Sequence, residues 1–275
     1  MDATVGRFNA QVERPEPIKF AWPIVILPEL FTTHIHLALL TGYLASVGWE
    51  VYVPDLRAAM GRDGAPVLGR IGCAGMVALI DELLAALGRD ALVMGHGVGG
   101  LIALKMAERP HVRAAIALAP AVPGRPSRLA PRLRGRFATW RGRPINPPRG
   151  RLRADFLSDA DAFQRDRLAH AMVSDAGVIA REVARGEFTL ARFADAAPRM
   201  IIAGEMDPFA PIERVRDLAG AIGARFAMLP SRGHWLIAGH ALERAIGETQ
   251  RFAVRTLGQD LLLLHPDEAK DPPNG

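Results

Sequence analysis

A histidine, an aspartate and a glycine-rich turn are the parts of this chain best suited to chemistry. His234 lies in the segment SRGHW (231–235), and Asp207 lies in the segment AGEMDP (203–208); each segment follows an apolar run. An aspartate that accepts a hydrogen bond from one imidazole nitrogen fixes the tautomer of the ring, so the other nitrogen can transfer a proton. The pair therefore predicts general acid–base chemistry.

The glycine-rich turn is the segment MGHGVGG (94–100), between an apolar strand-like run and a helix-like run. A G-x-S-x-G turn in this setting carries a nucleophile at its central position, and its flanking glycines allow a tight bend. The central residue here is Gly97, which has no side chain and can form no covalent intermediate. The backbone N–H of Val98, at the start of the following helix, can still stabilise an anion.

Strand-like and helix-like segments alternate along most of the chain. Short apolar runs predict strands at residues 23–27, 50–53, 91–94, 113–118, 198–203 and 225–229. Longer segments that end at glycine or before proline predict helices at about residues 33–47, 71–87, 98–108, 212–222 and 240–257. This alternation predicts an α/β fold with a mainly parallel, doubly wound sheet, whose sites lie at the carboxyl ends of the strands.

One region breaks the alternation. Residues 122–197 are first rich in proline and arginine and then helical, which predicts an inserted helical cap over the strand ends. The predicted organisation is a core made of residues 1–121 and 198–259, a cap made of residues 122–197, and a disordered tail at residues 260–275.

The glycine-rich turn, the aspartate and the histidine occur in the chain order of the α/β-hydrolase superfamily, which the sequence resembles. The segments PDLR (54–57) and PEL (28–30) resemble two further loops of that family, although the second lacks the usual His-Gly pair. The resemblance implies that Asp207 and His234 are catalytic, that Gly97 is the nucleophile position, and that the N–H groups of Val98 and Leu30 form the oxyanion hole. The predicted substrate-binding residues are Glu29, His34, Trp140 and Trp235.

Other reactive side chains have weaker claims. Glu29 fits a general acid or substrate anchor as well as it fits a solvated loop carboxylate. Cys73 is expected to be a packing residue, Ser231 has no geometric reason to reach the turn, and His96 is expected to pack against the sheet. The cap arginines could attract an anionic substrate, but we expect them to form a solvated basic face.

Composition limits the other functions. The chain has 275 residues, a formal net charge of +5 and one cysteine, so no intrachain disulfide is expected, which fits the cytoplasm. Aromatic residues for base stacking are scarce among the clustered arginines, so we expect no nucleic-acid partner. No apolar run is long enough to span a membrane, and the N-terminal segment does not resemble a secretion signal. We expect a small-molecule substrate, no cofactor and no metal; a homodimer is compatible with the sequence.

We expect the first of three functions and keep the other two as alternatives. The first is an enzyme that acts on a small, partly apolar carbonyl or ester-like substrate by His–Asp base chemistry, without a protein nucleophile. The second is a serine ester, thioester or lactone hydrolase that carries a Ser-to-Gly change at position 97. The third is a catalytically inactive homologue that binds a ligand. Hydrolysis, elimination and carbon–carbon cleavage all fit the first, and fold alone does not select among them.

Overall fold

The computed structural model describes residues 1–61, 67–124, 143–190, 192 and 195–262. Its sheet has eight strands in the order β1-β2-β4-β3-β5-β6-β7-β8. The two N-terminal strands pair antiparallel, and the strands from β4 to β8 pair parallel, so the predicted fold class is confirmed. The strands are β1 (Asp2–Val5), β2 (Phe8–Glu13), β3 (Ile24–Leu27), β4 (Val51–Pro54), β5 (Ala91–His96), β6 (Val112–Leu118), β7 (Arg199–Gly204) and β8 (Arg225–Leu229).

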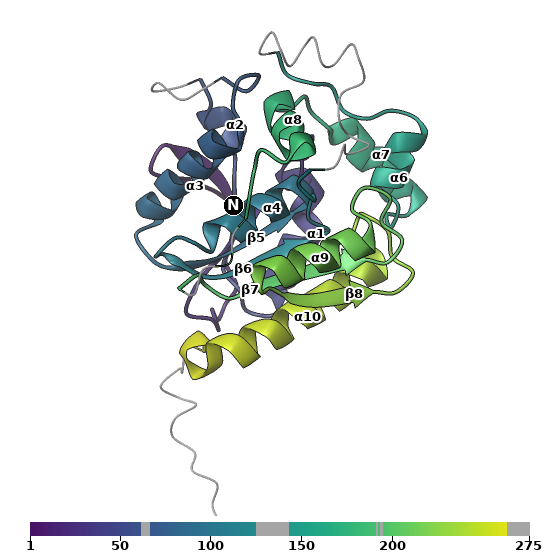
Figure 1. Ribbon diagram of the computed structural model, residues 1–275. Coiled ribbons are helices and arrows are strands. Elements are labelled where there is room, and N and C mark those ends of the chain that lie inside the picture. The colour runs from purple at the N-terminus through teal and green to yellow at the C-terminus, as the bar shows by residue number, and fades with distance from the viewer. Residues whose placement is uncertain (62–66, 125–142, 191, 193–194, 263–275) are drawn as a thin grey trace, which may run out of the picture.

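Helices cover both faces of the sheet (Figure 1). Helices α1 (His34–Ser46) and α10 (Gly239–Leu257) pack on one face. Helices α3 (Cys73–Leu87), α4 (Gly97–Met106) and α9 (Ile212–Ile222) pack on the other. The remaining helices are α2 (Leu56–Ala59), α6 (Arg151–Phe156), α7 (Ala162–Ala171), α8 (Gly177–Arg185) and the short 3-10 helix η1 (Gly258–Leu261).

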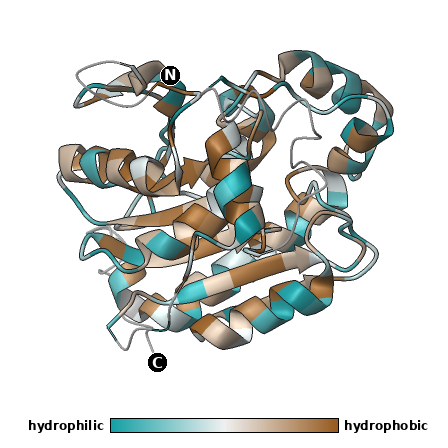
Figure 2. Cartoon of the chain, turned by 45° about the horizontal axis from the view of Figure 1, so that its top comes forward, coloured by the Kyte–Doolittle hydropathy of each residue, from teal (hydrophilic) through white to brown (hydrophobic). Residues whose placement is uncertain are grey.

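The central strands are apolar throughout because both of their faces are buried. Ile24 and Ile26 of β3 point into the core under α1 and α10, whereas Val25 and Leu27 point into the core under α3 and α4. In Figure 2 the central strands are mostly hydrophobic, while the outer helices carry both hydrophobic and hydrophilic residues. The stable sheet fixes the ends of its strands, and the loops that follow those ends carry the candidate site.

Two parts of the chain differ from the sequence analysis. The N-terminal segment forms the hairpin of β1 and β2, which the sequence analysis left without structure. Residues 260–262, assigned to a disordered tail, are folded: Leu261 is fully buried, and its carbonyl accepts a hydrogen bond of 2.9 Å from the N–H of Ala21. Residues 263–275 of that predicted tail lie outside the described residues.

Helices α6, α7 and α8 follow β6 and precede β7, within the segment predicted to form a cap. The N–H of Val173, between α7 and α8, donates to the carbonyl of Phe31 in the loop after β3 at 3.0 Å. The N–H of His234, after β8, donates to the hydroxyl of Ser158 between α6 and α7 at 3.1 Å. The helical segment therefore contacts loops at the carboxyl ends of the strands, whereas residues 125–142 of the predicted cap lie outside the described residues. In the described part of the chain, no helix combines the length and the apolar character that crossing a membrane requires.

Candidate active site

The turn between β5 and α4 has the tight geometry expected of the glycine-rich segment. Gly97 has a φ of +54°, a left-handed conformation that glycine adopts without strain. A side chain on Gly99 would strike the backbone carbonyls of Leu27 and Pro28 at the end of β3. Because the turn after β5 lies so close to the end of β3, the start of α4 is beside the loop that carries Glu29.

His234 and Asp207 lie together across the carboxyl ends of the sheet. Nδ1 of His234 is 2.8 Å from Oδ2 of Asp207. The other carboxylate oxygen, Oδ1, accepts the backbone N–H groups of Phe209 and Ala210 at 2.7 and 3.1 Å. Both side chains are buried. The aspartate is therefore fixed at both oxygens, and one nitrogen of the imidazole is oriented by it.

Glu29 occupies the space above Gly97. Its Oε1 accepts the N–H of Leu30 at 2.6 Å, and its Oε2 accepts the N–H of Val98 at 3.0 Å. Oε2 also lies 3.6 Å from Nε2 of His234, slightly beyond hydrogen-bond length. A Cβ atom added to Gly97 would overlap the Glu29 carboxyl group. The expected oxyanion donors are thus both bound to Glu29, and the carboxylate stands where a side chain of residue 97 would project.

The charges around His234 favour its protonated form. Burial alone would lower the pKa of His234, but the nearby carboxylates of Asp207 and Glu29 outweigh it and raise this pKa to about 10. Burial and the neighbouring His234 lower the pKa of His96 to about 3, so the two rings, which meet edge to face, have opposite protonation preferences. In this arrangement His234 is an imidazolium at neutral pH, and it becomes a base only when one of the negative charges is removed.

Ser158 and Asp159, between α6 and α7, hold the loop that carries His234, and sequence reasoning missed both of them. The hydroxyl of Ser158 accepts the N–H of His234 at 3.1 Å, and Asp159 accepts the N–H of Gly233 at 3.0 Å. The ring of Phe156 packs against the imidazole, with 5.2 Å between ring centroids. These side chains lie far from His234 in sequence, so only the fold reveals their role.

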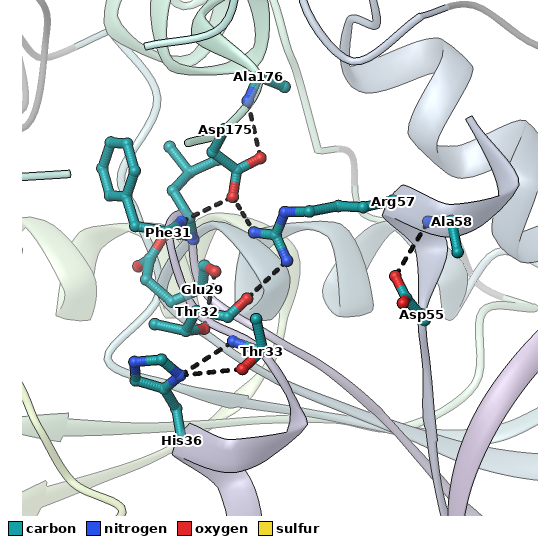
Figure 3. Close-up of polar contacts among 11 residues, drawn as sticks. Glu29, Phe31, Thr32, Thr33, His36, Asp55, Arg57, Ala58, Asp175 and Ala176 are labelled. Carbon is teal, nitrogen blue, oxygen red and sulfur yellow. Dashed lines mark hydrogen bonds and ion pairs between the residues drawn. The ribbon is translucent and has the colours of Figure 1, made fainter. Parts of the chain in front are cut away.

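The loop that carries Glu29 is clamped by a partly buried ion pair (Figure 3). Asp175, before α8, accepts the N–H of Phe31 at 2.6 Å and forms a short ion pair with Arg57. Arg57 also donates to the carbonyl of Thr32 at 2.6 Å. Phe31 has a φ of +70°, a conformation that costs a non-glycine residue roughly 1–3 kcal/mol and persists only where neighbours enforce it. The clamp supplies that enforcement.

Removing the clamp is expected to destabilise the protein. Asp175→Ala would leave the N–H groups of Phe31 and Ala176 without an acceptor and Arg57 without its counterion. We expect a loss of about 3 kcal/mol in the free energy of unfolding, measured by urea denaturation. The matched control is Asp166→Ala at an exposed position of α7, which should change stability by no more than about 0.5 kcal/mol. Equal effects of the two substitutions would contradict the assigned role.

Two cavities meet at Glu29. The larger has a volume of about 980 Å³, and its walls include the start of α1, the β1–β2 hairpin and helices α3 and α8. The smaller has a volume of about 30 Å³ and includes His234 in its wall. Glu29, Leu30 and Val98 line both cavities, whereas His234 lines only the smaller of these two. The larger cavity is wide enough for a small-molecule substrate, and the smaller is close to the roughly 30 Å³ that one water occupies.

The other predicted site residues are placed as follows. His34, at the exposed start of α1, lines the larger cavity. Trp235 is buried between the rings of His96 and Phe156 and lines neither of the two cavities, so its position is that of a core residue. Trp140 lies outside the described residues.

Cys73 and Ser231 are the two other side chains that could serve as a nucleophile, and neither lines either of the two cavities. Burial and the neighbouring Glu182 carboxylate raise the pKa of the Cys73 thiol well above its usual range. A thiol in this environment is a poor nucleophile. Ser231 is exposed on the turn after β8. Within the described chain, Glu29 is therefore the strongest candidate for a group that replaces a side chain at position 97.

Three buried residues could in principle hold a metal ion. Potential ligand atoms of Glu29, His96 and His234 all lie within 4.8 Å of one another. Among the described residues, Nδ1 of His96 and Nε2 of His234 have no hydrogen-bond partner. The sequence analysis found no metal-ligand spacing because these residues come from three distant segments. The imidazolium form of His234 accounts for the nearby Glu29 carboxylate without a metal, because Nε2 of His234 lies 3.6 Å from Oε2 of Glu29.

Comparison with protein families supports the resemblance noted in the sequence. Residues 21–246 match the model of the family described as "Alpha/beta hydrolase family". The chain belongs to this family. Comparison with curated protein sequences finds no match.

Solved structures of several hydrolases have the same fold. A monoacylglycerol lipase from Paleococcus ferrophilus superposes with a TM-score of 0.68 at 19% identity, covering 89% of this chain and 97% of that one. A thermophilic esterase from Thermogutta terrifontis gives a TM-score of 0.64 at 20% identity, covering 92% and 95%. A structure from work on carboxylesterases of the thaumarchaeon Nitrososphaera gargenis gives a TM-score of 0.66 at 16% identity, covering 94% and 98%. At these identities the likeness establishes the shared fold of this α/β hydrolase and leaves its substrate open.

Proposed function

We propose that this α/β hydrolase adds water to a small, partly apolar substrate through the group Glu29, His234 and Asp207, with no nucleophile on residue 97. The observation that carries the proposal is the position of the Glu29 carboxylate. It overlaps the place of a residue 97 side chain, accepts both expected oxyanion donors and faces the His234–Asp207 pair. Substrate would enter the larger cavity, and His234 would transfer protons to and from water in the smaller one.

The position of Glu29 modifies the chemistry expected from the sequence. A carbonyl or ester-like substrate needs donors for the negative charge that develops on its oxygen. Those donors, the N–H groups of Leu30 and Val98, are bound to Glu29. The space above Gly97 is filled by the same carboxylate. Glu29 therefore takes a central role that the sequence analysis gave only as one alternative.

The other two hypotheses receive less support. A serine at position 97 would collide with the Glu29 carboxylate, so an ordinary triad can form in this chain only if that carboxylate is displaced. A protein that only binds a ligand has no need for the hydrogen bond between His234 and Asp207, with both side chains buried and oriented. Both hypotheses remain outcomes of the experiments below.

The experiment that tests the proposal is hydrolysis of a panel of esters, thioesters, lactones, epoxides and haloalkanes. We expect turnover of at least one class, and we expect His234→Ala to reduce it by about a hundred- to ten-thousand-fold, because general acid–base catalysis contributes that much. His240→Ala, at an exposed position of α10, is the matched control and should retain full activity. Turnover that survives His234→Ala undiminished would overturn the proposal.

A serine-directed phosphonate provides a second measurement on the same preparations. The intact mass should stay unchanged, because residue 97 offers no hydroxyl for the reagent. A labelled residue would show that the chain has a serine-type nucleophile elsewhere, and would replace the proposed mechanism by that of an ordinary serine hydrolase.

A further inference from the structure

Glu29 separates the space suited to a substrate from the space suited to a water. The larger cavity reaches Glu29 but does not include His234, and the smaller cavity includes both. The wall of the larger cavity contains both polar and apolar side chains, and Leu27, Leu30 and Ile102 are among the apolar ones. A substrate can thus approach one side of the carboxylate while a water beside His234 approaches the other.

We propose that Glu29 is the catalytic nucleophile and that it attacks an sp³ carbon bearing a leaving group, as in an epoxide or a haloalkane. The inference rests on the proposed function and gives it a substrate class. Carboxylates of aspartate and glutamate form covalent intermediates in other enzymes, so the group is chemically competent. The carboxylate also has the required position, because it stands where a residue 97 side chain would project.

The hydrogen bonds of Glu29 select an alkyl carbon over an acyl carbon. Attack on an ester or thioester would place negative charge on the substrate oxygen, and that oxygen needs the N–H groups that already bind Glu29. Attack on an sp³ carbon creates no such oxyanion. In the second step the same two N–H groups stabilise the negative charge that develops on the carboxyl group of Glu29 itself.

In the first step, a carboxylate oxygen of Glu29 forms a bond to the substrate carbon, and the bond from that carbon to the leaving atom breaks. The electron pair goes to halide, or to the epoxide oxygen, which stays attached to the substrate as an alkoxide. Glu29 becomes an uncharged ester, so one of the negative charges that raise the pKa of His234 is lost. The proton that His234 then releases passes to the alkoxide, or to solvent when the leaving group is halide.

In the second step, water from the smaller cavity attacks Cδ of the Glu29 ester, and neutral His234 accepts a proton from that water. The oxyanion formed on Glu29 lies against the N–H groups of Leu30 and Val98. Its collapse breaks the bond between Cδ and the ester oxygen, and the alcohol product takes the remaining acid proton. Glu29 returns as a carboxylate and His234 returns protonated, so an epoxide and water give a diol, while a haloalkane and water give an alcohol and a hydrogen halide.

The test uses single-turnover reactions of the full chain in H₂¹⁸O, with 1,2-epoxyoctane and 1-bromooctane as separate probes. We expect ¹⁸O in the peptide that contains Glu29 and unlabelled oxygen in the first product, because the product oxygen comes from the carboxylate. His234→Gln should accumulate a covalent adduct on Glu29, at least tenfold above the level in the unsubstituted protein. The probe that gives the adduct identifies the leaving-group class.

Control variants make the result specific. Glu29→Gln should give no adduct and no turnover with either probe, whereas Glu213→Gln, at an exposed position of α9, should behave like the unsubstituted protein. Turnover that is lost with EDTA and restored by Zn²⁺ would make Glu29 a metal ligand and overturn the inference. Label that appears only in the product, or turnover that survives Glu29→Gln, would also overturn it.

The two proposals can fail separately. Hydrolysis of esters that depends on His234, with no adduct from either probe in the His234→Gln protein, would retain the proposed function and reject Glu29 as the nucleophile. An adduct on Glu29 in a protein that turns over nothing would retain the reactivity assigned to Glu29 and reject the hydrolytic function.

Discussion

A chain that carries Gly97→Ser together with Glu29→Ala is expected to hydrolyse p-nitrophenyl butyrate at least about a thousand times faster than a chain that carries Gly97→Ser alone. The reason is the shared space above the turn. A serine side chain at position 97 can be seated only if the Glu29 carboxyl group moves away, because its Cβ would overlap that group. Removing the carboxylate makes room for the hydroxyl and also frees the N–H groups of Leu30 and Val98 for a substrate carbonyl.

The paired substitution also leaves His234 with a hydroxyl to activate and with Asp207 still hydrogen-bonded to it at 2.8 Å. The measurements are ester hydrolysis and the increase in intact mass after treatment with a serine-directed phosphonate. Glu29→Ala alone and Gly97→Ser with Glu213→Ala are the controls, and neither should gain activity. Similar ester hydrolysis by the single Gly97→Ser variant and the paired variant would show that Glu29 does not occupy the site in solution.

The sequence predicted the sheet because the evidence for it is local. Apolar runs that follow one another at strand–helix–strand spacing determine which segments are buried on both faces, and the observed β3 and β5 follow from such runs. The hairpin of β1 and β2 also had a local signal that the analysis overlooked. Phe8, Ala10 and Val12 alternate with polar residues and are all buried, as expected of a strand with one buried face.

The position of Glu29 could not be predicted, because it depends on contacts between distant segments. The sequence places a carboxylate in the loop after the first parallel strand, but its direction is set by the N–H of Val98 and by the clamp of Asp175 and Arg57. Absence of a side chain at Gly97 is visible in the sequence, whereas the group that fills the space is visible only in three dimensions. A glycine at a position that usually carries a nucleophile is therefore a reason to examine which neighbouring side chain has entered its place.

Asp207→Asn is expected to reduce turnover by about ten-thousand-fold while the fold is retained, a loss of the size seen when the aspartate of a Ser-His-Asp triad is changed in this way. Oδ2 of Asp207 now accepts a hydrogen bond from the N–H at Nδ1 of His234, whereas an amide NH₂ in its place would donate to that nitrogen and favour the other tautomer. Nε2 would then carry a proton and could not accept one from water. The control is Asp217→Asn at an exposed position of α9, which should leave turnover unchanged.

The same substitution should alter the dependence of stability on pH. Because Asp207 and Glu29 outweigh the effect of burial and raise the pKa of His234 from its ordinary value of 6.5 to about 10, the folded protein binds a proton more tightly than the unfolded chain. This contribution to stability is fully present below about pH 6.5 and is lost as the pH rises through about 10. Asp207→Asn removes the carboxylate that raises the pKa of His234 more strongly than Glu29 does, so this pKa should fall and the decline in stability across this range should become shallower. The effect is measured by urea unfolding of the variant and of the Asp217→Asn control at both ends of this pH range. If the free energy of unfolding changes with pH by the same amount in both proteins, Asp207 does not hold the proton on His234.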